Sequence, residues 1–132
     1  MSLGPNASHA VSAKADDPLE QQLRALRREY LSDSAQRVAE LRQVRARLAG
    51  GEQAALAAMR QAFHRLAGSG GSYGFPLVSS NGREGERLVQ TLIDAGATPG
   101  AAACDALDAC IDRIVAAFQE ARRQLDGEAA TP

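Results

Sequence analysis

Hydrophobic residues recur every three or four positions along most of this chain, and polar residues fill the intervals between them. This spacing predicts amphipathic α-helices. The pattern starts at Asp17 and Pro18, which suit a helix N-terminus. It weakens at Ser32–Ser34, then resumes and stops at Gly50, so we expect a short first helix and a longer second one. Three further helices are expected over residues 52–71, 76–95 and 99–125.

Each expected helix has one apolar face that can pack against its neighbours. In chain order the apolar series are Leu23, Leu26 and Tyr30; Val38, Leu41, Val44 and Leu48; Leu56, Met59, Phe63, Leu66 and Gly70; Leu77, Val78, Leu88, Val89, Leu92 and Ile93; and Leu107, Ile111, Ile114, Phe118 and Leu125. Connections of a few residues between long helices favour antiparallel neighbours. The aromatic content of only 4% also favours helices over a sheet. We therefore predict an all-α fold, an antiparallel up-and-down four-helix bundle with a short additional N-terminal helix.

A chain of 132 residues is long enough for one domain with a core of its own. Residues 1–16 are small, polar and aperiodic, so we expect a disordered leader or linker that includes His9. The bundle is expected over residues 17–126, followed by a flexible tail at 127–132. These linker-like ends are compatible with a domain excised from a larger protein.

The charges of the chain nearly cancel, with fifteen basic and sixteen acidic residues and a net charge of -1. Such a balance provides no global field to attract nucleic acid or an anionic membrane, so neither is an expected partner. No apolar run approaches the roughly 20 residues that cross a bilayer. The N-terminus also lacks the apolar core of a signal peptide, so the expected compartment is the cytoplasm.

The two cysteines, Cys104 and Cys110, fall in one predicted helix. Their spacing separates them by about 9 Å along the axis, too far for a relaxed disulfide. They have neither a CxxC spacing nor a neighbouring histidine cluster, so a metal site is not expected. We expect two small buried thiols, and no metal or other cofactor.

The stretch FHRLAGSGGSYGFP, residues 63–76, combines one histidine with a run of very small residues. His64 lies one residue off the apolar seam of its helix, on a flank with Arg60, Ala67, Gly68 and Gly71. An imidazole with an ordinary pKa of about 6.5 is largely neutral at cytoplasmic pH and can attack as a nucleophile. A flank without side chains would let a reactive group on a second macromolecule approach it.

Glycines in a helix can also serve only for close helix packing. Gly82 and Gly85 of the next predicted helix could meet Gly68 and Gly71 for that reason. On this alternative His64 is simply an exposed histidine. The spacing of the residues leaves both interpretations open.

The sequence HRLAGSGGSYGF resembles the signature of the histidine-containing phosphotransfer (HPt) domain, with His64, Gly68, Ser69 and Gly74 on the family's frame. The resemblance extends over residues 19–125. It implies that His64 is the phosphoacceptor, which takes a phosphoryl group from a receiver-domain aspartate and passes it to another receiver. Gly68 would keep the approach open, and Glu86 falls where many members have a glutamine that hydrogen-bonds the histidine.

The sequence departs from the family pattern at Ala67, where lysine is usual. That lysine would offset the charge of the phosphoryl oxygens, and the only lysine of the chain is Lys14. We expect an arginine to supply the cation, with Arg60 favoured and Arg65 or Arg87 as alternatives. Otherwise the site works with less electrostatic help and holds a more labile phosphohistidine.

The resemblance implies a phosphocarrier and not an enzyme, with the catalytic metal and acidic pocket on the receiver partner. No P-loop or other nucleotide loop is present in the sequence. We expect a monomer whose partners are receiver domains of response regulators or hybrid histidine kinases. Tyr73 and Phe75 are candidate docking contacts, although a role as core or loop anchors is the simpler interpretation. The main alternative function is a degenerate HPt-like docking module that binds a receiver or helical partner without phosphotransfer.

Overall fold

The computed structural model describes residues 17–130, which form helices joined by short turns. The predictions for residues 1–16, including His9, and for residues 131–132 lie outside the described residues. The helices are α2 (Pro18–Ser32), α3 (Ser34–Ala49), α4 (Ala54–Ser72), α5 (Pro76–Ala95) and α6 (Ala101–Ala130). The predicted all-α fold is confirmed.

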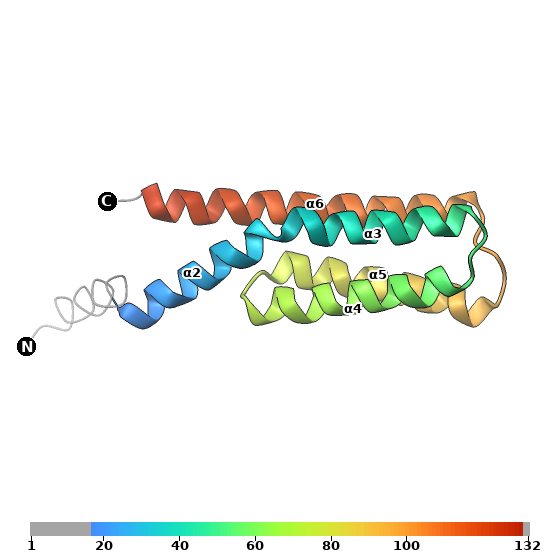
Figure 1. Cartoon of the computed structure of the whole chain (residues 1–132), viewed down its shortest axis with the longest axis horizontal. Coiled ribbons are helices and arrows are strands. Elements are labelled where there is room, and N and C mark those ends of the chain that lie inside the picture. The colour runs from blue at the N-terminus through green and yellow to red at the C-terminus, as the bar shows by residue number, and fades with distance from the viewer. Residues whose placement is uncertain (1–16, 131–132) are drawn as a thin grey trace, which may run out of the picture.

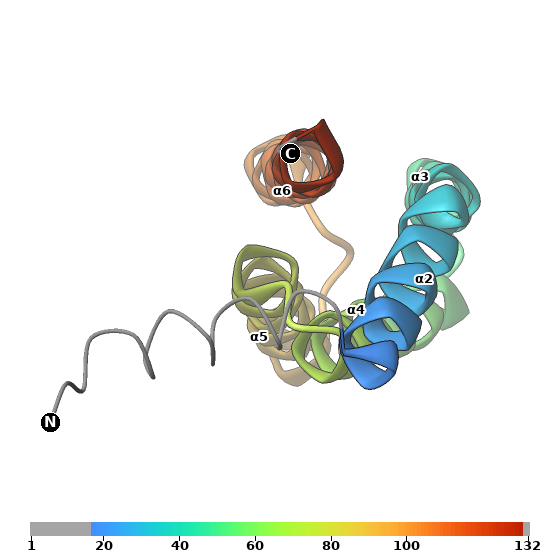
Figure 2. The ribbon, with the colours of Figure 1, turned by 90° about the vertical axis from the view of Figure 1, so that its left-hand side faces the viewer.

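Helices α3, α4, α5 and α6 run side by side along the long axis of the molecule and alternate in direction (Figure 1). Seen nearly down that axis, they occupy the four corners of a bundle (Figure 2). Helix α2 leads obliquely into α3 and packs against α6 as well as α3. This is the predicted up-and-down four-helix bundle with an additional helix before it.

The junction between α2 and α3 is a single residue, Asp33, at the position where the helical pattern of the sequence weakens. Arg122 of α6 donates hydrogen bonds to the carbonyl oxygen of Leu31, at 3.2 Å, and to the hydroxyl of Ser34. Ser34 is 1% exposed, so its hydroxyl depends on this partner. The guanidinium therefore connects α6 to the end of α2 and the start of α3 at this junction.

The core includes all of the apolar series that the sequence predicts for α4 and α6, together with residues of the other helices such as Leu41 of α3 and Val89 of α5. Both series are buried along their length, whereas Val38 and Val44 of α3 are only partly buried. Leu23 and Leu26 of α2 are 37% and 46% exposed, so only Tyr30 of that series enters the core. The reason is that α2 joins the bundle near its C-terminal end, while its earlier turns diverge from α6, as Figure 1 shows.

One helix end differs from the prediction. Helix α6 continues to Ala130, whereas the apolar stripe predicts an end near residue 125. Leu125 is buried, and the residues after it are mostly good helix formers, so a single glycine at 127 is tolerated at a cost of about 1 kcal/mol. The four predicted connections fall where the structure has them. Within residues 17–130, no helix is both long and apolar enough to span a membrane.

Candidate functional site

His64 lies on the solvent side of α4, and 66% of its side chain is exposed. Its Nδ1 is 2.9 Å from Oε2 of Glu86 on α5, whose side chain is 26% exposed. An ionised carboxylate can only accept a hydrogen bond. Nδ1 therefore carries the ring proton and donates a hydrogen bond to Glu86. Nε2 has no hydrogen-bond partner among the described residues and keeps its lone pair. The contact thus selects the tautomer in which Nε2 is the nucleophilic nitrogen.

The contact between His64 and Glu86 depends on a close approach of α4 and α5. A Cβ added at Gly82 would lie 2.8 Å from the backbone nitrogen of Ala67, and one at Gly70 would lie 2.9 Å from the backbone nitrogen of Ser79. Carbon atoms do not approach nitrogen so closely, so glycine is required at both positions. Small residues therefore bring the two helices together beside the histidine.

Ser79 provides a polar link within the same interface. Its hydroxyl donates a 2.8 Å hydrogen bond to the carbonyl oxygen of Ala67, and the residue is 3% exposed. With His64 opposite Glu86 and Ala67 opposite Ser79 and Gly82, the two helices have a defined antiparallel register. This register determines which residues of α5 lie level with the histidine.

The exposed surface of small residues beside His64 is smaller than the sequence predicts. Ala67 is 7% exposed and lies in the α4–α5 interface, so the expectation that it forms part of an open strip is wrong. Gly68 is exposed, and apart from its own helix backbone a Cβ there would have no atom of the described residues within 4 Å. Gly71 is also exposed, but a Cβ there would be 3.4 Å from Oγ of Ser79. The open surface beside His64 is therefore centred on Gly68.

Some of the glycines do serve close helix packing, but the expected pairing of Gly82 and Gly85 with Gly68 and Gly71 is wrong. Gly82 and Gly85 meet Ala67 and Phe63, not Gly68 and Gly71. Because a glycine inside a helix costs about 0.5–1 kcal/mol relative to alanine, an open position such as Gly68 gains nothing in packing that would offset this cost. Close packing therefore explains some of the glycines and leaves Gly68 unexplained.

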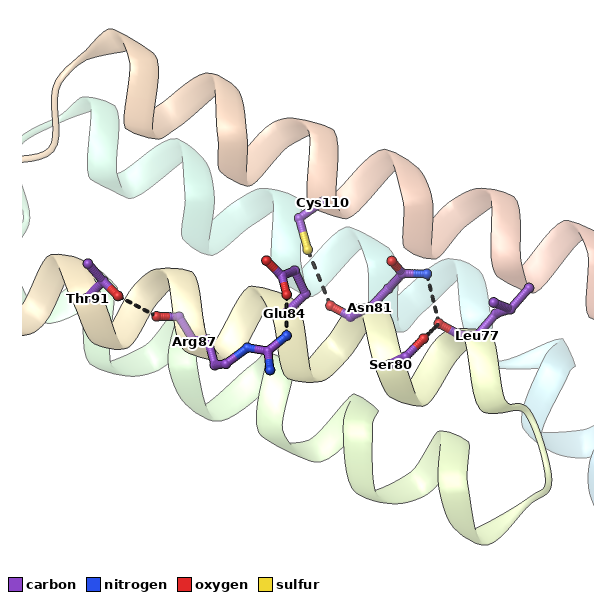
Figure 3. A network of polar contacts seen from close by, with 7 residues as sticks. All are labelled: Leu77, Ser80, Asn81, Glu84, Arg87, Thr91 and Cys110. Carbon is purple, nitrogen blue, oxygen red and sulfur yellow. Dashed lines mark hydrogen bonds and ion pairs between the residues drawn. The ribbon is translucent and has the colours of Figure 1, made fainter.

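The candidate arginines differ in their surroundings. Arg87 pairs with Glu84 on α5, one of the polar contacts along that helix that Figure 3 draws. Arg60 and Arg65 are exposed, and neither has a hydrogen bond or ion pair with any described residue. Arg60 is one turn before His64 on the same flank of α4. Because Arg87 already has an ion-pair partner, Arg60 and Arg65 remain as candidates for the cation beside His64.

The turn between α4 and α5 is held by aromatic side chains. The rings of Tyr73 and Phe75 stack on that of Tyr30, with centroids 4.5 Å and 5.8 Å from it. The Tyr30 hydroxyl is 2.7 Å from that of Ser69, and burial raises the pKa of Tyr30, so the phenol stays protonated and can donate. Tyr73 and Phe75 are only partly exposed, in agreement with their role as anchors of the turn.

Metal-ligating side chains do not gather near the histidine. Among the described residues there is no group of three or more His, Cys, Asp and Glu side chains that could hold a metal ion. Cys104 and Cys110 are free thiols, the first half-buried and the second buried. The Cys110 thiol donates to the carbonyl oxygen of Asn81 at 3.3 Å, as Figure 3 shows. The group that the described site presents to solvent is the imidazole of His64, in contact with Glu86.

Comparison with known proteins agrees with this arrangement. The family model of the Hpt domain matches residues 25–117, a segment that contains α3, α4 and α5 and most of α2 and α6. No curated protein and no solved structure matches the chain.

Proposed function

The chain belongs to the Hpt domain family, and we propose that His64 is the residue on which it carries a phosphoryl group. Domains of this family are phosphocarriers of two-component phosphorelays and interact with receiver domains. The observation that carries the proposal is the 2.9 Å contact between Nδ1 of His64 and Glu86, which leaves Nε2 available on an exposed helix face.

In the proposed step the lone pair on Nε2 attacks the phosphorus of a receiver's aspartyl phosphate. The N–P bond forms as the P–O bond to the aspartate breaks, and the aspartate leaves as a carboxylate. The proton on Nδ1 stays there, hydrogen-bonded to Glu86, whose negative charge balances the positive charge that develops on the ring. Transfer to a second receiver is the same step in reverse, so no proton has to be exchanged with solvent.

The neighbouring residues have separate roles in this proposal. Gly68 leaves room for the receiver's aspartate, since nothing lies within 4 Å of a Cβ at that position. Gly71, also exposed, extends this surface by one further turn. Ala67 stands where the family usually has lysine, and Arg60 is the cation favoured to compensate from the same helix. Phosphoryl transfer depends mainly on positioning and on cations near the moving charge.

The remaining components are expected on the partner. We propose that the catalytic metal and acidic pocket belong to receiver domains of response regulators or hybrid kinases. We further propose that residues 17–126 form the functional unit and that it acts as a monomer on receivers in the cytoplasm. On this view the chain is a carrier intermediate and not an enzyme.

A second function is favoured by one observation, the alanine at position 67. Without the lysine, the same surface would serve a degenerate module that docks a receiver or helical partner and carries no phosphoryl group. The intact pair of His64 and Glu86 favours the phosphocarrier, because a module that only docks has no use for an oriented imidazole.

The two functions are separated by a labelling experiment. The protein is incubated with several receiver domains that carry radiolabelled aspartyl phosphate, and label that is acid-labile and alkali-stable is measured on the chain. We expect such label on the parent protein and none on His64→Gln. Absence of label with every receiver would favour the docking module, and persistence of label in His64→Gln would show that His64 is not the phosphoacceptor.

A further inference from the structure

The packing of Ala67 indicates where the side chain of a lysine at this position would lie. This residue is 7% exposed and faces α5, with Gly82 against its backbone nitrogen and Ser79 bonded to its carbonyl oxygen. A side chain from position 67 would therefore emerge at the outer edge of the α4–α5 interface. A side chain of α5, the helix on the other side of this interface, could reach the same space.

The register of the two helices shows which residue of α5 lies level with this space. Glu86 is opposite His64, and Gly82 is opposite Ala67. Arg83 follows Gly82 and precedes Glu86 by three residues, or about 4.5 Å along the helix axis. Arg83 is thus level with Ala67 and less than one helical turn from the level of the histidine.

The helical angle places Arg83 on the same edge of α5 as Glu86. At about 100° per residue, Arg83 is turned from Glu86 by about 60° in one sense, whereas Gly82 and Gly85 are turned by about 40° and 100° in the other. Both glycines are buried and Arg83 is exposed. Arg83 therefore begins on the solvent side of the edge from which Glu86 reaches His64.

The side chain of Arg83 has no bonding partner within the described residues. It makes no hydrogen bond or ion pair with any residue in 17–130, in contrast to Arg87, which pairs with Glu84. Figure 3 shows that the Glu84–Arg87 pair belongs to the polar network on α5 beneath α6. A guanidinium presents several N–H donors in a planar fork that matches phosphate oxygens. Arg83 has the charge, the donors and the freedom that a phosphoryl group on His64 requires.

We propose that Arg83 supplies the positive charge that the family's lysine would supply from position 67. This inference rests on the proposed function of His64 and adds a residue from the adjacent helix to the phosphoryl site. Arg83 forms no bond to phosphorus and exchanges no proton; it donates hydrogen bonds to the oxygens of the phosphoryl group while that group moves to Nε2. Together with Arg60, it places a cation on each side of His64 along the direction of the helix axes.

The test uses phosphoramidate, a small donor that phosphorylates imidazole and releases ammonia, so no receiver is needed. Phosphorus NMR follows the formation of phosphohistidine on the full chain, and His64→Gln reports the contribution of His9. We expect Arg83→Gln to slow loading of His64 by about fivefold, the effect of one exposed charge. Arg83→Lys should restore the rate to within about twofold of the parent.

Arg87→Gln is the matched control, because it removes the same charge from the next turn of the same helix. We expect it to load at the parent rate. Loading of Arg83→Gln at the parent rate, or equal slowing by Arg87→Gln, would overturn the assignment of Arg83. Neither result bears on whether receivers phosphorylate His64, which the labelling experiment with receivers tests by itself.

Discussion

Gly85 of α5 lies directly against the aromatic ring of Phe63 in α4. A Cβ added at Gly85 would be 2.7 Å from Cγ of the ring and closer still to its edge. Phe63 is fully buried and is the residue just before His64. Gly85 thus acts with Gly82 and Gly70 in setting how closely α5 approaches α4 beside the histidine.

This relationship predicts that Gly85→Ala destabilises the bundle. The ring of Phe63 is enclosed and cannot withdraw, so the helices must separate, at a cost of about 1–3 kcal/mol in the free energy of unfolding. Urea denaturation followed by circular dichroism measures this cost. The separation should also weaken the contact between His64 and Glu86, seen as a change in the ring nitrogen chemical shifts. Unchanged stability would contradict this prediction, because it would mean that the α4–α5 interface can accommodate the added methyl group.

Gly68→Ala should have the opposite effect on stability. A Cβ there meets nothing within 4 Å, and alanine is favoured over glycine inside a helix by about 0.5–1 kcal/mol. We expect a more stable protein that accepts phosphoryl groups from receivers more slowly, because the methyl group narrows the approach to His64. A stabilised variant with unchanged transfer would mean that Gly68 does not form part of the docking surface.

Substitution of Glu86 tests the orientation of the imidazole. Glu86→Ala removes the acceptor for the Nδ1 proton, so nitrogen NMR should show a mixture of the two neutral tautomers and transfer should slow severalfold. Glu86→Gln should retain the tautomer, since its amide oxygen can still accept. Glu84→Ala is the control, because Glu84 pairs with Arg87 instead. A single unchanged tautomer in Glu86→Ala would refute the role of this contact.

Arg122 and its neighbour Arg123 provide a matched pair for the α2–α3 junction. Arg122→Ala leaves the hydroxyl of buried Ser34 and the carbonyl oxygen of Leu31 without their partner, which should cost about 1–3 kcal/mol in the free energy of unfolding. Among the described residues Arg123 bonds to Glu120, whose side chain is 45% exposed, so Arg123→Ala should change stability by less than about 0.5 kcal/mol. Equal effects in the two variants would contradict the assigned role of Arg122.

The sequence by itself determined the helices, their order and the identity of the family. The apolar seam that includes Phe63 and Leu66, and the glycines that end the helices, are local signals that tertiary contacts did not override. Periodicity also placed His64 beside the seam, because the angle between residues on one helix follows from their spacing alone.

Relations between helices were decided only by the tertiary structure. The pairing of His64 with Glu86, the burial of Ala67 and the position of Arg83 all depend on the register of α4 against α5. That register arises from glycines on one helix that meet backbone and ring atoms of the other, a fit between surfaces distant in sequence. Periodicity describes one helix at a time, so it could not show that Ala67 faces α5 instead of the solvent.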